Sequence, residues 1–338
     1  MRVNVLVKPY SILFIGMSFF IPLLQIFGDG GFVGIIGARN EGEHIFETGN
    51  KYPNLSGIRG GSRITYQRNF NLAGIEGGYF KNKYSFRGRV ISNFWNQNSG
   101  GTRDEDFFLG NSSSEKGSKF SPFQGVLHDT AYTFTGTANF ADGKGRSTIS
   151  EYNLEGFFRY HFGDASPDPW ATGSGFFLSG GLRYSYAKLQ VYDVIQYVAS
   201  RPIFYGPIGS GLSYSYSFTE IPVGGGYIFN LGNFKIEPSV HLLYAFIKTR
   251  DFHIQRALNF LAHTAGPGFL ARIEGSYSIS ENAMIKIGVT GHRQFTGGSF
   301  KTRGGLYEND ILSNYLGSYK SYINTKEVIF DMSYIMRL

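Results

Sequence analysis

Regular alternation of apolar and polar residues, repeated in one short segment after another, is the feature that most constrains how this chain folds. In "NFKIEPSVHLLYAFIKTRDFH" (233–253) every even position from Phe234 to Phe246 is apolar, whereas the odd positions are largely polar. Side chains along a β-strand point alternately to opposite faces, so this segment has one apolar face and one polar face. The two-residue period predicts a β-strand, and Asp251 and His253 continue its polar face.

The same period recurs along the rest of the chain. In "STISEYNLEGFFRYHF" (147–162) the residues Tyr152, Leu154 and Phe158 alternate with polar ones, and the last segment alternates up to the terminal Leu338. Counting these segments gives an even number of strands, as single-chain outer-membrane β-barrels require. The ten predicted strands cover residues 32–47, 62–80, 84–97, 147–162, 175–192, 212–229, 233–249, 268–280, 283–296 and 322–337.

Composition agrees with this reading. The 338 residues include 46 glycines, 32 phenylalanines and 23 tyrosines, and only 17% are charged, which favours many short strands over helical bundles. A soluble β-sandwich also alternates, but it exposes fewer aromatic residues and rarely carries ionic residues on one face of nearly every strand. The fold class that we expect is all-β, a ten-stranded antiparallel transmembrane β-barrel with long extracellular loops.

The N-terminus predicts export. Arg2 and Lys8 precede the apolar run Ser11 to Phe27, as in a secretory signal peptide. We therefore expect a signal peptide over residues 1–30 and a barrel over 31–338, located in the outer membrane. The cleavage site stays open, and an uncleaved membrane anchor is the alternative. The absence of cysteine excludes a disulfide framework and a thiolate zinc site.

The predicted connections alternate between short and long. The long ones fall at about 48–61, 98–146, 193–211, 250–267 and 297–321. In outer-membrane barrels short turns lie in the periplasm and long loops outside the cell. This alternation places "RDEDFF" (103–108), after the third strand, and "RDFH" (250–253), after the seventh, at the same extracellular rim.

These two segments carry groups suited to activating a water molecule. Asp251 and His253 share a strand face, so the carboxylate can orient the imidazole and raise its basicity, as a general base needs. Asp104 and Asp106 form a second acidic pair, and two adjacent carboxylates tend to share one proton and can hold a water. The pattern predicts hydrolysis without a metal or a covalent nucleophile.

A barrel with Asp-x-Asp after the third strand and Asp-x-His after the seventh resembles the omptin family of outer-membrane aspartate/histidine proteases. The likeness extends to "GEHIFE" (42–47), to "RITYQRNFNLAGIEGGYFKNKYSFRGRV" (63–90) and to "FLARIEGSYSISENAMIKIGV" (269–289). It spans most of the mature chain, and it is carried by order and topology, because no single motif is long.

The resemblance implies an aspartic-type endopeptidase that cleaves peptides or proteins near basic residues. It makes Asp251 and His253 the catalytic dyad and Asp104 and Asp106 the opposing couple. A water held between His253 and Asp104 would attack the scissile carbonyl. The resemblance also implies that the active site faces outward from the cell.

Two further positions come from the same resemblance. Glu43 matches a glutamate of the family's specificity pocket, whereas Thr249 stands where the family has an acidic residue, which weakens or alters the expected basic preference. Lys188 is expected to face lipopolysaccharide on the outer wall, and lipopolysaccharide is a candidate requirement for activity. The net charge of +7 also favours anionic lipid phosphates.

Other readings stay open. An isolated Asp-x-His is often a solvated pair, and only the matching acidic pair on the third strand favours catalysis. The runner-up function is a catalytically inactive barrel that acts as an adhesin or small-solute porin. Neither a cofactor nor a nucleic-acid partner is expected, and metal-binding spacings are absent from the sequence. Charged residues predicted to face the interior should pair there and argue against a wide pore: Arg87, Arg89, Lys235, Glu237, Arg272, Glu274, Lys286, Glu327 and Asp331.

Overall fold

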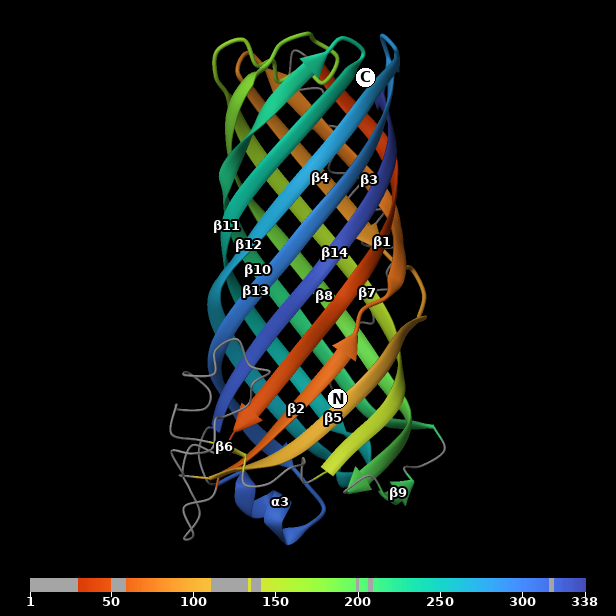
Figure 1. The fold of residues 1–338 in the computed structure, drawn as a ribbon, viewed down its shortest axis with the longest axis vertical. Coiled ribbons are helices and arrows are strands. Elements are labelled where there is room, and N and C mark those ends of the chain that lie inside the picture. Colours follow the sequence, from red (N-terminus) through yellow and green to blue (C-terminus); the bar gives the residue numbers. More distant parts are fainter. Residues whose placement is uncertain are drawn as a thin grey trace, which may run out of the picture.

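Alternating strands close into a barrel in the computed structural model, which describes residues 30–49, 59–110, 133–134, 141–198, 201–205, 209–315 and 319–338. Every strand pairs antiparallel with its neighbours, and the last strand pairs with the first, so that the sheet forms a ring of 10 strands (Figure 1). The predicted fold class is therefore confirmed. The predicted signal peptide lies almost wholly outside the described residues, which begin at Gly30.

Two positions of the ring are each built from two strands. The strands are β1 (Gly30–Gly49), β2 (Arg59–Gln67) with β3 (Phe70–Lys81), β4 (Tyr84–Ser92) with β5 (Gln97–Gly110), β7 (Ala141–His161), β8 (Gly175–Val198), β10 (Ser210–Leu231), β11 (Phe234–His253), β12 (Leu258–Ser280), β13 (Ala283–Gly304) and β14 (Tyr319–Arg337). The short strands β6 (Thr133–Phe134) and β9 (Arg201–Tyr205) pair with β5 and β8. The predicted single strand 62–80 is thus interrupted at Arg68 and Asn69, whose backbone N–H groups bond to carbonyls of Gly42 and Ser99.

The two ends of the barrel differ. At one end the strands are joined by tight turns, and Asn82 (φ 53°) and Gly232 (φ 79°) supply the left-handed backbone that such turns need. At the other end lie the long connections, with β6, β9 and the helix α3 (Glu308–Ser313) (Figure 1). We call these the short-turn end and the long-loop end.

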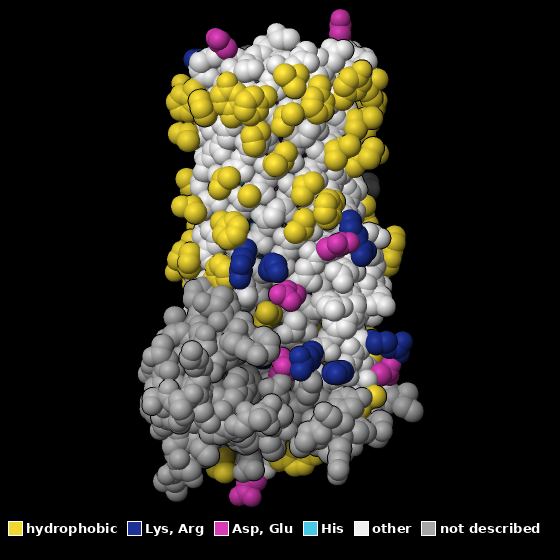
Figure 2. Space-filling view, viewed as in Figure 1, with side chains coloured by type: hydrophobic (Ala, Val, Ile, Leu, Met, Phe, Trp, Pro, Cys, Tyr) yellow, Lys and Arg dark blue, Asp and Glu magenta, His cyan; other side chains and the backbone are white. Residues whose placement is uncertain are grey.

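The outer wall carries an apolar belt. On β11 the exposed side chains of Val240, Leu242, Tyr244 and Phe246 give way to exposed Lys248 and Arg250 toward the long-loop end. Figure 2 shows the same change over the visible face, where hydrophobic side chains cover the upper and middle wall and charged ones gather lower down. Such a belt is what lipid contact requires. In the described part of the chain, no helix has the length and apolarity to cross a membrane.

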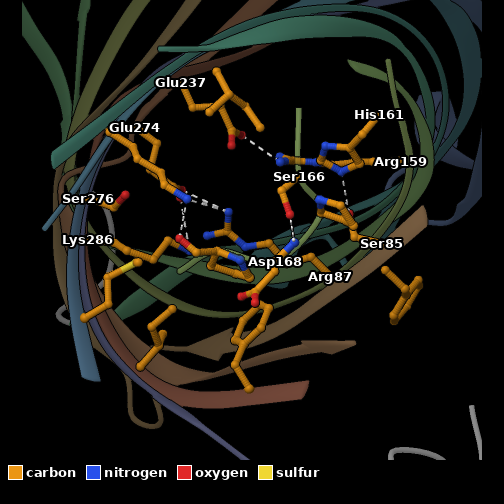
Figure 3. A pocket seen from close by; sticks show the side chains of 18 residues that line it. Ser85, Arg87, Arg159, His161, Ser166, Asp168, Glu237, Glu274, Ser276 and Lys286 are labelled. Atoms are coloured by element: carbon orange, nitrogen blue, oxygen red, sulfur yellow. Dashed lines mark hydrogen bonds and ion pairs between the residues drawn. The ribbon is translucent and has the colours of Figure 1, made fainter. Parts of the chain in front are cut away.

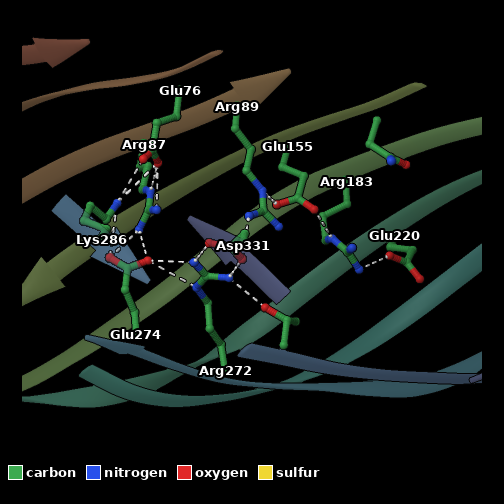
Figure 4. A network of polar contacts seen from close by, with 12 residues as sticks. Glu76, Arg87, Arg89, Glu155, Arg183, Glu220, Arg272, Glu274, Lys286 and Asp331 are labelled. Carbon is green, nitrogen blue, oxygen red and sulfur yellow. Dashed lines mark hydrogen bonds and ion pairs between the residues drawn. The ribbon is translucent and has the colours of Figure 1, made fainter. Parts of the chain in front are cut away.

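The interior beside the short-turn end is filled by ion pairs (Figure 4). Arg87 binds Glu76 and Glu274 at 2.7 and 2.9 Å, and Arg272 binds Asp331 at 2.5 Å. The network continues through Arg89, Glu155, Arg183 and Glu220. The predicted pairing of interior charges is confirmed for all of them except Lys235, whose ammonium donates to backbone carbonyls instead. Buried charges are tolerated when each has a partner.

The interior toward the long-loop end is apolar and aromatic instead. Phe46, Tyr66, Leu189, Tyr214 and Ile247 are among the buried residues of this cluster, and each is at most 2% exposed. The described interior is therefore occupied by side chains along its length. This cluster also forms the floor beneath the strand ends at the long-loop end.

Several strands run further toward the long-loop end than predicted. The expected loop 250–267 is wrong, because β11 continues to His253, a single 3-10 turn covers Ile254–Arg256, and β12 begins at Leu258. Likewise β13 extends to Gly304 rather than residue 296. Beyond the apolar belt the backbone ladder continues while the outward face no longer needs apolar residues, so the alternation that reveals a strand fades.

Candidate active site

Four of the predicted site residues lie on two strands at the long-loop end. Asp104 and Asp106 belong to β5, whereas Asp251 and His253 close β11. In the ring β5 and β11 are separated by β7, β8 and β10, so the two pairs stand on different walls of the barrel. The predicted location of both pairs at one end agrees with these strand positions.

The register shows which way these side chains point. Asp104 stands opposite Ile64 of β2, and Asp251 stands opposite Tyr214 of β10. Residues directly opposite each other in an antiparallel pair share a face of the sheet. Ile64 and Tyr214 are 3% and 0% exposed inside the barrel, so Asp104 and Asp251 also face the interior. His253 shares that face because it lies two residues beyond Asp251.

Asp251 and His253 form a hydrogen-bonded dyad. The Nε2 atom of His253 lies 3.1 Å from Oδ2 of Asp251, and Asp251 is 2% exposed whereas the His253 side chain is 24% exposed. With the carboxylate as acceptor, Nε2 carries the proton and donates it, which leaves Nδ1 as the nitrogen that can accept one. The ring also packs against Phe260, with centroids 5.0 Å apart.

The electrostatics of His253 connect the two walls. Burial lowers the pKa of His253, but the Asp251 carboxylate, the hydrogen bond that His253 donates to it and the Asp104 carboxylate together raise the pKa above its ordinary value. Arg256 acts in the opposite direction. Asp104 and His253 also share the inward face at the long-loop end, where the registers of β5 and β11 place them. The two walls therefore present acid and base groups to one region.

The Asp104 side is held by small polar neighbours. Ser62 of β2 donates a hydrogen bond from Oγ to Oδ1 of Asp104 at 3.2 Å. Gly143 of β7 stands opposite Asp104, and a Cβ there would lie 3.4 Å from the Asp104 Cβ. Asp106 is in register with Ser62, and its backbone alone is described.

The structure does not bring Glu43 to this group. Glu43 of β1 stands opposite Lys326 of β14 and Gln67 of β2, which are both exposed, whereas the next residue, His44, is fully buried inside. With a period of two, an inward His44 turns Glu43 to the outer wall, so the structure places Glu43 away from the pocket in which the resemblance had put it. Thr249 does face the interior, at 5% exposure.

Lys188 lies where the sequence predicted, on the outward face of β8. It is exposed and stands opposite Ser215 of β10, which in turn stands opposite Arg250 of β11. Lys188 and Arg250 thus share one row on the outer wall, just beyond the apolar belt. Cations at this level meet lipid phosphates in a membrane.

Sequence reasoning missed the aromatic floor of the site. The rings of Tyr66 and Tyr214 stack with centroids 4.7 Å apart, and Nε2 of His44 lies 2.7 Å from the Tyr214 hydroxyl. Burial raises the pKa of Tyr66, and the carboxylates of Asp251 and Asp104 raise it further. The sequence did contain one indication, because Tyr66 lies two residues after Ile64 and therefore shares the inward face of its strand. A lone tyrosine in a strand, however, usually indicates packing alone.

A cavity of about 70 Å³ lies elsewhere, inside the barrel beside the short-turn end (Figure 3). Arg87, Arg159, His161, Lys235 and Glu237 line it, and the described turn after β7 covers it. Nζ of Lys235 donates to the carbonyls of that turn at 2.6 Å. The cavity belongs to the ion-pair half of the barrel and is separated from the dyad by the apolar cluster. In the described ranges, no group of three or more potential ligands could hold a metal ion.

Comparison with known proteins gives a family and a fold. The family described as "Putative porin" matches residues 51–332. The chain is similar to the outer membrane protease OmpT from Escherichia coli, with 10% identity and a TM-score of 0.67 over 92% of this chain and 97% of that one. It is also similar to the translocator domain of autotransporter NalP from Neisseria meningitidis, with 10% identity and a TM-score of 0.39 over 97% and 96%. No curated protein sequence matches the chain. At these identities the likeness shows the barrel fold alone.

Proposed function

The chain belongs to the family described as "Putative porin" and is an outer-membrane β-barrel protein, and on this premise we propose that it is an endopeptidase of the omptin type. The observation that carries the proposal is geometric: the hydrogen-bonded pair Asp251–His253 on β11 and the carboxylate of Asp104 on β5 face the same end of the barrel interior from different walls. Asp104 also adds to the rise in the pKa of His253. Acid and base groups that face one region are what a hydrolytic site requires.

In the proposed reaction a water held between His253 and Asp104 attacks the carbonyl carbon of a peptide bond. Nδ1 of His253 accepts a proton from that water, and the new carbon–oxygen bond gives a tetrahedral oxyanion. Asp251 stabilises the imidazolium through Nε2. When the carbon–nitrogen bond breaks, the imidazolium returns its proton to the leaving amine. Asp106 would share the role of Asp104 in holding the water.

Substrate preference in this proposal depends on the inward carboxylates. A basic side chain beside the scissile bond would meet Asp104, but it gains no contact from Glu43, which faces outward, or from the uncharged Thr249. The preference for basic substrate residues should therefore be weaker than in a pocket where two carboxylates contact the basic side chain.

Orientation and lipid are part of the same proposal. The long-loop end, and the site with it, would face the outside of the cell, because barrels of this class keep their short turns in the periplasm. Lys188 would contact a phosphate of lipopolysaccharide, with Arg250 in the same outward row.

The test uses the purified barrel refolded with lipopolysaccharide and two fluorogenic peptides, one with arginine and one with glutamine beside the same bond. Cleavage should survive a chelator and should be lost in His253→Ala and in Asp104→Ala. The proposal fails if the alanine variants cut as fast as the parent, or if a folded parent cuts neither peptide.

The second candidate is a barrel without protease activity that passes small solutes, which the family's description favours. The ion pairs and apolar cluster inside the described part of the barrel oppose it, because a conducting barrel needs a water-filled path. Single-channel recording in a planar bilayer separates the two: steady conductance without peptide cleavage would favour the solute channel. An adhesin would give neither signal.

A further inference from the structure

Two buried polar atoms at the floor of the candidate site have no hydrogen-bond partner among the described residues. One is the hydroxyl of Tyr66, and the other is Oδ1 of Asp251. Tyr66 is fully buried and Asp251 is 2% exposed, so open solvent does not satisfy either atom. The Tyr66 hydroxyl can donate a hydrogen bond, and Oδ1 of Asp251 can accept one.

The backbone register brings these two residues to one place. Tyr214 stands directly opposite Asp251 on the same inward face. The ring of Tyr66 stacks on Tyr214 with centroids 4.7 Å apart and an interplanar angle of 17°. Tyr66 therefore lies one aromatic ring away from the cross-strand neighbour of Asp251.

The neighbouring hydroxyl is already used. Tyr214 and Nε2 of His44 are 2.7 Å apart, and Nδ1 of His44 lies 2.9 Å from Oγ1 of Thr325. Oδ2 of Asp251 is likewise taken by His253. Among the groups around the dyad, the Tyr66 hydroxyl, Oδ1 of Asp251 and the hydroxyl of Thr249 remain without a hydrogen-bond partner in the described residues. Of these hydroxyls, that of Tyr66 belongs to the ring stacked on Tyr214, the cross-strand neighbour of Asp251.

Electrostatics agree with this placement. The Asp251 carboxylate is the leading charge that raises the pKa of Tyr66 beyond the effect of burial, and Asp104 adds to it. Tyr66 consequently keeps its proton at all ordinary pH values and remains a hydrogen-bond donor. Buried donors and acceptors left unpaired are costly and are commonly joined by an internal water.

We propose that Tyr66 is a positioning residue for the dyad, and that its hydroxyl donates to a buried water which in turn donates to Oδ1 of Asp251. This inference rests on the proposed protease function. Holding Oδ1 keeps the carboxylate in the orientation that leaves Oδ2 on Nε2 of His253, and hence leaves Nδ1 free as the base. The bond also draws negative charge away from the imidazole.

The pH dependence follows from the groups that face Asp251. His253 is bonded to Asp251, Tyr214 stands opposite it, and Tyr66 and His44 contact Tyr214. The charges of Asp104 on β5 and Arg256 in the turn act on His253. Burial and Arg68 hold the pKa of His44 well below its ordinary value, whereas Asp251 raises that of His253, so His253 is the imidazole here whose titration shapes the rate profile. Without the donor from Tyr66, the Asp251 charge acts more strongly on His253, whose pKa rises further. The acid limb of the rate profile then moves to higher pH.

The decisive variant is Tyr66→Phe, which removes the hydroxyl and nothing else. We expect kcat to fall about ten- to a hundredfold, as for loss of a hydrogen bond to a charged group, with KM unchanged. The melting temperature should stay the same or rise, because the hydroxyl has no protein partner. Tyr216→Phe is the matched control: its hydroxyl donates to Glu151 at 3.3 Å, so it should lower the melting temperature and leave the acid limb in place.

A crystal structure of the parent at a resolution that shows waters gives a readout that does not depend on activity. A water between the Tyr66 hydroxyl and Oδ1 of Asp251, lost in Tyr66→Phe, supports the bridge. If that water is present but no peptide is cut, the bridge stands and the protease proposal fails. If neither atom contacts a water, or if Tyr66→Phe keeps both the parent's kcat and its acid limb, the inference is overturned.

Discussion

Arg68 offers the sharpest test of how the barrel interior is held together. Its guanidinium is 2% exposed and contacts Glu151 at 2.8 Å and Glu327 at 2.9 Å. It also lies 5.4 Å from the ring centroid of Phe70 and 5.6 Å from that of Tyr216. Replacing it by methionine, in Arg68→Met, keeps most of the packing but leaves buried Glu151 without a cation and Glu327 with His292 alone.

Removing one partner of a buried ion pair typically costs about 3 to 5 kcal/mol, because the remaining charge is desolvated and unpaired. Arg68 serves two carboxylates, so we expect the free energy of unfolding to fall by at least about 3 kcal/mol. The paired variant Arg68→Met with Glu151→Gln should recover part of the loss, since it removes the carboxylate that Arg68→Met leaves without a cation. Arg39→Met is the matched control: the Arg39–Glu41 pair is 42% and 55% exposed, and exposed pairs contribute about 0 to 1 kcal/mol.

The assay is reversible urea unfolding of the refolded barrel in detergent, followed by tryptophan fluorescence, with heat-modifiable migration in gels as the check on folding. A loss below about 1 kcal/mol for Arg68→Met would refute the reasoning. An equal loss for Arg39→Met would do so as well, since the effect would then not depend on burial.

The remaining predictions concern the site and the outer wall. His253→Ala should lower kcat by about 10² to 10⁴, and a loss under about tenfold in the peptide assay would count against its role as the base. Because Asp251 raises the pKa of His253 and the base must be neutral, activity should rise with pH through that pKa. Asp251→Asn should move this acid limb to lower pH, and an unmoved limb would contradict the dyad. Glu43→Gln should leave the ratio of arginine to glutamine peptide cleavage unchanged, since Glu43 faces outward; a lowered ratio would restore it to the pocket. Lys188→Ala should raise the lipopolysaccharide concentration needed for half-maximal activity without changing the melting temperature, and identical titration curves would remove Lys188 from lipid binding.

The structure differs from the sequence-based expectation in two ways. A strand extends beyond the end of its apolar alternation, and a residue faces the opposite side of its strand. The segment 250–267 looked like a long loop because apolar alternation fades after Phe246, yet the hydrogen-bonded ladder continues to His253 and resumes at Leu258. Outside the lipid belt both faces of a strand tolerate polar residues, so the hydropathy pattern no longer shows whether the backbone is extended. Glu43 was misplaced for a related reason: a position in a motif does not fix the phase of a strand, and a shift of one residue reverses the face.

The sequence by itself determined the class of fold and the direction of most side chains. A two-residue period with aromatic residues on one face and ionic ones on the other is stable only when the strands close on themselves between lipid and a polar interior, and Arg87, Glu274 and Asp331 were assigned to that interior from parity alone. Tertiary structure alone decided what meets across the barrel. Asp104 and His253 lie far apart in the chain, and Tyr66, Tyr214 and Asp251 come from three separate strands. Their proximity depends on the ring closure and register of the whole sheet, which local periodicity does not encode.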